Sequence, residues 1–548
     1  MNDSRRAALL FLALAAIAAA FRFPQLAARP MHADEAVNAD KLGTLLEHGR
    51  YEYSSVEFHG PTLYYAALVV ARAHGLTDYR ELNEAVLRVV PAILGVLLVA
   101  AHFWLIPYLG LPAAACAALF TAVSPVMVYY SRYFIHETLL LFLTFCALLA
   151  VLAYLERPRA GLALTIGAVF GLMYATKETW IIAAACMLAA GLDKLKHASQ
   201  WGAAGEQQSA FSGQLPAAGL GKLKHAPPKR LSGNNRSLWS RLGMGCVRFR
   251  AATKGSGYFR TNPKHLLLAA VGFVVMAGVF LSSFFTHPRG IVDSVLAYGT
   301  YFARGVGVHT VHVHPWYFYF ACLRGEVLIG ALACVGLALS NAPRFLKIYT
   351  VLMVAMYCAI PYKAPWNVLS FWHAGILLAA AGVVWLFQRL SKPLVVVTMA
   401  MVVASLAGLA RGDSMEYASD PRNPWVYAHT GTDVFQIIDV VKALAAVHPD
   451  GRAMPIQIFT HNNLWPLPWY LRRYPNVRWW NGVSDSAPLA PVILATPEME
   501  PALLHRIYEV PPPGHREMYV NMFDRYVELR PRVEVRGYVA KSLWDDMR

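Results

Sequence analysis

The segment RPMHADEAVNAD, residues 29–40, places three carboxylates and a histidine directly behind an apolar run. That run, residues 7–21, follows Arg5 and Arg6 and suits either a cleaved signal peptide or an uncleaved membrane anchor. We favour the anchor, because it would hold the acidic doublet of Asp34 and Glu35 at a fixed place beside the membrane surface. The segment therefore predicts a membrane protein whose first loop carries chemistry.

Apolar runs of roughly transmembrane length recur from this first one to about residue 410. The chain has 548 residues, of which 57% are hydrophobic and only 15% charged. This pattern predicts a polytopic α-helical membrane protein with about eleven transmembrane helices. The predicted spans after the first are residues 84–108, 111–130, 138–156, 160–176, 178–192, 264–286, 315–340, 345–361, 366–388 and 393–410.

The formal net charge of +16 comes largely from one loop, residues 192–264. This loop holds thirteen Lys and Arg residues against Asp193 and Glu206. A basic loop between apolar spans is explained by the positive-inside rule, which we favour over nucleic-acid binding. The loop is also rich in Gly and Ser, so we predict that it is cytoplasmic and disordered.

Counting crossings from a cytoplasmic N-terminus at Arg5 and Arg6 puts the short basic turns on the cytoplasmic side as well. The same count places the unusual polar residues on the other side of a cell inner membrane. There, residues 61–74 are too short to span and predict a helix lying in the interface. The predicted extracytoplasmic segments are residues 24–83, 131–137, the turns at Lys177 and Lys363, residues 287–314 and the tail from Arg411.

The tail, residues 411–548, has balanced charge and short β-rich runs, PIQIF, VRWW and PVILAT, between helix-like stretches. It therefore predicts a soluble α/β domain that follows a transmembrane domain of residues 1–410. The tail has no cysteine, and the seven cysteines of the chain show neither a disulfide framework nor zinc spacing.

Carboxylates and cations converge on the predicted extracytoplasmic side. An ionised side chain at bilayer depth costs roughly 2.5–3.5 kcal/mol, so charges at span ends usually have partners or a function. A carboxylate can take a proton from an acceptor hydroxyl, and Lys or Arg can hold a phosphate leaving group. These residues are Asp34, Glu35, His59, Arg132, Glu137, Lys177, Glu178 and Lys363.

The segment DEAVNADKLGTLLEHGRYEYSSVEFHGPTLYY, residues 34–65, resembles the first outer loop of GT-C glycosyltransferases. This superfamily includes protein O-mannosyltransferases and the lipid A aminoarabinose transferase. Within it, the tail segment WPLPWYLRRY resembles a branch of archaeal and bacterial proteins connected with the flipping of lipid-linked sugars. The resemblance covers most of residues 30–380, where LRVVPAILGVLLVAA, SPVMVYYSRYFIHETLL, GLMYATKETW, HPWYFYF and YKAPWNVL follow in the order that the superfamily shows.

This resemblance implies transfer of a sugar from a polyprenyl-phosphate-type donor to an acceptor on a lipid, glycan or protein. Asp34 would be the general base, with Glu35 as its neighbour or alternate. Arg132, Lys177 and Lys363 would neutralise the donor phosphate. The residues Glu137 and His59 would orient the acceptor or a cation. Two departures concern His59, which stands near a position where some relatives have Lys, and Lys363, which is followed by Ala-Pro-Trp.

Structural roles compete with these functional ones. Asp34 and Glu35 could cap a helix, which is worth about 0.3–1 kcal/mol. Lys177 could be a snorkelling residue at a span end, and Arg132 could pair with Glu137. The segment NNLWPLPWYLRRYPNVRWW could bind a glycan, but a core role for most of its tryptophans is favoured.

The motif HTVHVH, residues 309–314, suggests a metal site but offers no complete ligand set. We therefore predict no metal ligands and no cofactor, and leave a divalent cation open. A flippase or transporter partner for lipid-linked sugars is the competing class of function. A weaker alternative is a scaffold whose tail recruits enzymes.

Overall fold

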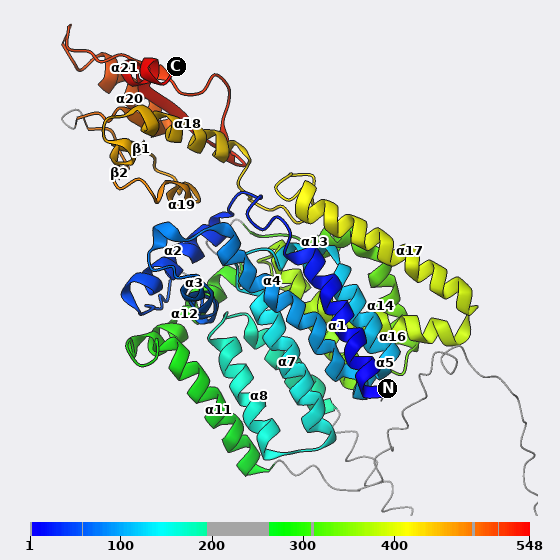
Figure 1. The fold of residues 1–548 in the computed structure, drawn as a ribbon. Helices are drawn as coiled ribbons and strands as arrows, with labels where there is room; N and C mark the ends of the chain where they lie inside the picture. The colour runs from blue at the N-terminus through cyan, green and yellow to red at the C-terminus, as the bar shows by residue number, and fades with distance from the viewer. Residues whose placement is uncertain (1–2, 57–58, 194–261, 308–311, 485–487, 513) are drawn as a thin grey trace, which may run out of the picture.

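The computed structural model describes residues 3–56, 59–193, 262–307, 312–484, 488–512 and 514–548. It shows a bundle of helices with a sheet-containing region at one end (Figure 1). We call this end of the bundle its outer end. Most of the basic loop that is predicted to be disordered, and His309, lie outside the described residues.

A helix lies in every apolar run that the sequence singles out. Seven helical segments of the described residues are long and apolar enough to cross a membrane, which agrees with a polytopic protein. One of them, Glu84–Val123, contains two predicted spans, so the number eleven stays a prediction. The helices are α1 (Asp3–Arg22), α4 (Glu84–Ala101), α5 (Ile106–Val123), α6 (Pro125–Tyr130), α7 (Glu137–Glu156), α8 (Ala160–Tyr174), Trp180–Asp193, α11 (Pro263–Leu281), α13 (Phe318–Cys322), α14 (Val327–Leu339), α15 (Arg344–Ala359), α16 (Val368–Arg389) and α17 (Lys392–Arg411).

Small residues let neighbouring helices of the bundle approach closely, as is common in membrane proteins. A Cβ atom on Gly167 of α8 would lie 1.8 Å from the carbonyl oxygen of Ala269 on α11. A Cβ atom on Gly336 of α14 would lie 1.8 Å from the carbonyl oxygen of Leu378 on α16. Only glycine fits at these two contacts.

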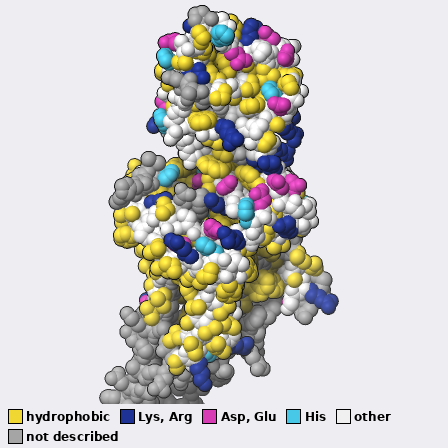
Figure 2. Space-filling view, turned by 90° about the vertical axis from the view of Figure 1, so that its left-hand side faces the viewer, with side chains coloured by type: hydrophobic (Ala, Val, Ile, Leu, Met, Phe, Trp, Pro, Cys, Tyr) yellow, Lys and Arg dark blue, Asp and Glu magenta, His cyan; other side chains and the backbone are white. Residues whose placement is uncertain are grey.

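Helices that do not belong to the long bundle lie at its outer end. They are α2 (Ala33–His48), α3 (Thr62–Ala73) and α12 (Arg289–Gly305). The helix predicted for residues 61–74 corresponds to α3. On the face seen in Figure 2, hydrophobic side chains dominate the lower bundle, whereas charged side chains gather at the outer end and on the C-terminal region.

The C-terminal region contains a mixed five-stranded sheet in the order β2-β1-β3-β7-β4. The predicted β-rich runs form β1 (Ile456–Phe459), β2 (Val477–Trp480) and β3 (Val492–Ala495), which pair in parallel. Strands β4 (Tyr519–Asn521) and β7 (Arg536–Ala540) continue the sheet in antiparallel pairing. The region is completed by the hairpin of β5 (Glu528–Arg530) and β6 (Val533–Glu534) and by helices α18 (Asp433–Val447), α19 (Leu467–Leu471), α20 (Glu500–Tyr508) and α21 (Lys541–Met547).

Two segments after residue 411 pack on the bundle. Trp425, between α17 and α18, is buried in the same hydrophobic core as the bundle helices, and its carbonyl accepts a hydrogen bond from the Tyr130 hydroxyl. Helix α19 packs on α2, and its Trp469 is fully buried in that core too. The C-terminal region is thus docked on the outer end, directly above the loop that carries Asp34.

Candidate active site

The acidic doublet opens helix α2, and its two side chains have opposite environments. His32 caps the helix by accepting a hydrogen bond from the backbone N–H of Asp34 at 3.1 Å. The side chain of Asp34 is 55% exposed, whereas Glu35 is fully buried. The Asp34 carboxylate lies 3.9 Å from His32 Nδ1. Asp34 is therefore accessible to a substrate, and Glu35 is not.

Glu35 lies at the centre of a buried hydrogen-bond network. Burial alone would raise the pKa of this carboxyl, but the neighbouring Arg29 and Arg88 outweigh it and hold the pKa well below its usual range. The geometry favours a structural role for Glu35 over the predicted one as an alternate base. Its oxygens accept hydrogen bonds from Arg88 Nε and Nη2 at 2.8 Å, from Arg29 Nη2 at 3.1 Å, from the Phe134 N–H at 2.9 Å and from the His32 N–H at 3.0 Å.

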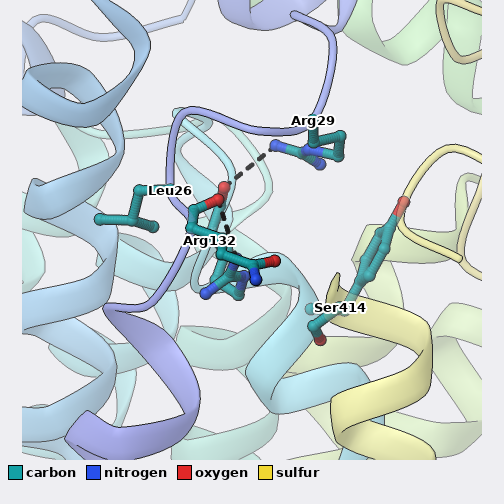
Figure 3. Close-up of a pocket in the computed structure, with 6 residues that line it drawn as sticks. Leu26, Arg29, Arg132 and Ser414 are labelled. Atoms are coloured by element: carbon teal, nitrogen blue, oxygen red, sulfur yellow. Dashed lines mark hydrogen bonds between the residues drawn. The ribbon is translucent and has the colours of Figure 1, made fainter. Parts of the chain in front are cut away.

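Arg132 lies behind this network and contacts backbone carbonyls. Its guanidinium donates to the carbonyls of Arg22 and Pro24, where α1 ends, at 2.9 and 2.6 Å. Arg29 donates in turn to the Arg132 carbonyl at 3.0 Å (Figure 3). Burial lowers the pKa of Arg132 to about 10, and the nearby Arg29 adds to the effect. The adjoining cavity, about 10 Å³, holds no more than one water. The geometry thus favours a structural role for Arg132 over the predicted phosphate contact.

Lys177 and Glu137 form a buried ion pair across the starts of two helices. Both residues are at most 6% exposed. Because helix α6 ends at Tyr130 and α7 begins at Glu137, the carboxylate turns toward Lys177, and the pair with Arg132 that the sequence allowed does not form. The pair neutralises the Lys177 charge internally.

His59 belongs to a second polar group beside this pair. Its Nδ1 lies 2.8 Å from a Glu178 oxygen, and the other Glu178 oxygen accepts a hydrogen bond from the Tyr53 hydroxyl at 2.7 Å. The His59 ring stacks on Tyr301 with centroids 5.6 Å apart. Burial would raise the pKa of Glu178, but His59 and the hydrogen bonds more than offset it and lower that pKa. His59 is therefore held by a carboxylate and an aromatic ring.

The turn with Lys363 is fixed against the histidine segment. The Lys363 N–H donates to the His312 carbonyl at 2.9 Å, and its ammonium donates to the carbonyls of His314 and Ile360. The rings of His312 and His314 each lie 2.8 Å from the Tyr427 hydroxyl. Within the part of the chain that the structure describes, no three His, Cys, Asp or Glu side chains gather as a metal site.

Tyr362 lies within electrostatic reach of several of these groups. Burial raises the pKa of this tyrosine to about 12, and the carboxylates of Asp34 and Glu137 add to that rise, whereas Arg304 opposes it. Asp34 also acts electrostatically on His312 and on Arg530 of the C-terminal region. The structure therefore brings Asp34 and the Glu137–Lys177 pair to the surroundings of one hydroxyl, and leaves Glu35 and Arg132 in the packing behind it.

Sequence reasoning did not single out three residues of this site. Tyr362 stood inside the motif YKAPWNVL, so its neighbour Lys363 could have drawn attention to it. Arg304 and Arg530 carry no local signal, because they reach the site only through the positions of α12 and of the β5–β6 hairpin.

Comparisons with known proteins agree with this architecture. A family model described as dolichyl-phosphate-mannose-protein mannosyltransferase matches residues 73–200. The chain has no match among the curated proteins. Its fold is similar to that of ArnT from Cupriavidus metallidurans, solved with undecaprenyl phosphate, at a TM-score of 0.60 and 14% identity over 96% of this chain and 97% of that one.

A second similar structure is the archaeal oligosaccharyltransferase AglB from Archaeoglobus fulgidus, in complex with an inhibitory peptide and a dolichol-phosphate. Its TM-score is 0.52 at 12% identity, and the match covers 90% of this chain and 69% of that one. At these identities the likeness concerns the fold, which is shared over nearly the whole chain.

Proposed function

From the GT-C fold of this chain, we propose that it transfers a sugar from a polyprenyl-phosphate-type donor to an acceptor hydroxyl at the outer end of the bundle. The solved structures with this fold hold undecaprenyl phosphate or dolichol-phosphate, which supports the donor class. Because the short basic turns are predicted to be cytoplasmic, we place the outer end on the extracytoplasmic side of a cell inner membrane. The acceptor is a lipid, glycan or protein.

The observation that carries the proposal is the environment of Asp34. Its carboxylate is exposed at the outer end, within electrostatic reach of His312 and Tyr362, while the adjacent Glu35 is fully paired. An exposed carboxylate without a Lys or Arg ion pair among the described residues can accept a proton. Asp34 is therefore suited to act as the general base.

In this reaction the acceptor hydroxyl gives its proton to Asp34 as its oxygen bonds to the anomeric carbon of the sugar. The bond from that carbon to the donor phosphate breaks, and the lipid phosphate leaves with the electron pair. Cations near the base would stabilise the charge on the leaving phosphate. Arg304 and Arg530 are partly exposed and suit this role better than the buried Lys363 and Arg132, whose charges contact backbone carbonyls. Lys177 is already paired with Glu137.

The test compares Asp34→Asn with Asp40→Asn, a matched change of a partly exposed carboxylate on the same helix. A lost general base costs about 10²–10⁴-fold in rate, so Asp34→Asn should lower sugar transfer at least ~100-fold. Donor binding should stay close to that of the wild type, and Asp40→Asn should keep full transfer. The readout is transfer by the purified full chain from a panel of polyprenyl-phosphate sugars, with donor binding measured separately.

Two results would reject the proposal. One is an Asp34→Asn variant that transfers sugar as fast as Asp40→Asn. The other is a wild-type protein that moves lipid-linked sugar across a vesicle membrane without forming product, which is the behaviour of a flippase.

A further inference from the structure

A cavity of about 370 Å³ lies at the outer end, away from the Asp34 site. It is formed where α14 begins and α17 ends, and the segment that follows α17 closes it. Its size suits the headgroup of a lipid and exceeds that of a few waters. Its lining includes Arg324, Gly325, Glu326, Leu409, Asp413 and Tyr417.

Two opposite charges in this cavity lack ion-pair partners within 4.0 Å among the described residues. Arg324 donates one hydrogen bond, to the Arg422 carbonyl at 3.3 Å. Asp413 accepts one, from the Trp425 indole at 3.2 Å. The two side chains are near enough to interact electrostatically but form no salt bridge. One cation and one anion are thus left to face the cavity.

The other charged residues of the lining already have polar partners within the protein. Arg422 pairs with Asp420 at 2.6 Å. Glu326 is fully buried and accepts hydrogen bonds from Ser124 Oγ, the Val126 N–H and the Trp372 indole at 2.7, 2.9 and 2.8 Å. A ligand therefore meets Arg324 and Asp413 as the free charges.

The cavity borders a surface suited to lipid. Leu409 and Tyr417 belong to its lining and are 39% and 48% exposed. Val327 and Leu328, in the first turn of α14, are more than half exposed. Trp316, two residues before α13, is also exposed, and aromatic residues of this kind mark the headgroup level of a membrane. An acyl chain can follow the apolar surface while its headgroup enters the cavity.

We propose that this cavity binds the headgroup of a phospholipid with a primary ammonium, such as phosphatidylethanolamine. Arg324 would bind its phosphate, and Asp413 would accept hydrogen bonds from its ammonium. Phosphatidylcholine offers a cation without N–H donors, and phosphatidylglycerol offers no cation for Asp413. The inference does not depend on the proposed transfer reaction, because it concerns binding alone.

The test is native mass spectrometry of the full chain in detergent, titrated with the three lipids carrying identical acyl chains. Wild type should bind phosphatidylethanolamine at least ~10-fold more tightly than phosphatidylcholine. Asp413→Asn should abolish this preference, and Arg324→Gln should weaken binding of all three lipids at least ~10-fold. The control Arg289→Gln changes an exposed arginine at the outer end that does not line the cavity, and it should leave every affinity unchanged.

A further variant tests the role of the cavity volume while both charged residues are kept. A Cβ atom added at Gly325 would meet only the tip of the Leu409 side chain, at 3.5 Å. Gly325→Phe should therefore fold and fill the cavity. It should abolish phosphatidylethanolamine binding although Arg324 and Asp413 are kept. The proposal is overturned if the three lipids bind alike, if Arg324→Gln behaves as Arg289→Gln, if Gly325→Phe still binds, or if millimolar inorganic phosphate displaces the lipid.

Discussion

At the scale of single residues, two adjacent carboxylates in one turn of helix differ in their exposure and in their partners. Asp34 and Glu35 follow a histidine cap, and the helix directs them to opposite surroundings. The arginines Arg29 and Arg88 meet Glu35, so a buried charge is compensated by two others. Breaking such a pair is costly because a charge is left buried without a partner. Within this doublet, Glu35 thus holds the loop in place, and Asp34 keeps an exposed carboxylate.

We expect Glu35→Gln to impair folding, whereas Asp34→Asn should impair only turnover. Loss of the Glu35 charge leaves the two arginines facing each other and should cost about 3–5 kcal/mol. Thermal unfolding and the yield of monodisperse protein measure this cost. If both variants unfold at the wild-type temperature, Glu35 does not hold the loop as described.

The same carboxylate gives the pH dependence a definite sign. The pKa of Glu35 is lowered in the folded state, so its stabilisation is present above the ordinary Glu pKa of about 4.3 and is lost as pH falls below it. In the experiment above, wild-type stability should therefore decline toward acid more steeply than that of Glu35→Gln.

At the scale of elements, the sequence was sufficient for the apolar helices and for three strands of the sheet. Hydrophobic runs report burial in lipid or in a core directly, so every predicted run contains a helix. Ion-pair partners are different. Along the chain Arg88 is a single charge in an apolar run, and only the folded structure shows that its side chain reaches Glu35 in the first turn of α2. Arg132 and Lys177 likewise have partners that the sequence does not reveal, because pairing inside the protein cannot be seen along the chain.

Helix packing at this scale predicts a sharp contrast between two glycines of α8. Gly167→Leu should destabilise the bundle by about 1–3 kcal/mol or more, because its side chain would meet the backbone of α11 at Ala269. Gly161→Leu, on the same helix, has open space around it and should behave as wild type. Thermal unfolding in detergent measures both variants, and equal unfolding temperatures would contradict the close helix contact.

At the scale of the whole molecule, the C-terminal region completes the site. Met31 lies three residues before Asp34, and its N–H donates to the Tyr470 hydroxyl at 2.8 Å. His32 lies 3.1 Å from the Tyr427 carbonyl, and Arg530 lies within electrostatic reach of Asp34. The two hydrogen-bonded pairs are 439 and 395 positions apart, so neither composition nor a local motif predicts them. The position of Asp34, the proposed general base, therefore depends on how the region docks.

Trp469 is the residue by which this docking is best tested. Its side chain is fully buried in the bundle core, its indole donates to Glu84 at 2.8 Å, and its ring packs against Tyr79. Truncation of a buried Trp costs about 3–5 kcal/mol, so Trp469→Ala should undock the region without unfolding its sheet. Limited proteolysis between α17 and α18 should accelerate at least ~10-fold, and sugar transfer should fall with it.

The matched control is Trp479→Ala, which removes a tryptophan that is 42% exposed on strand β2 of the same region. It should change neither proteolysis nor transfer. If Trp469→Ala is cleaved more rapidly yet transfers sugar at the wild-type rate, docking does not position Asp34. Asp34 would then be held by contacts within the bundle, among them the buried Glu35 network that fixes the first turn of α2.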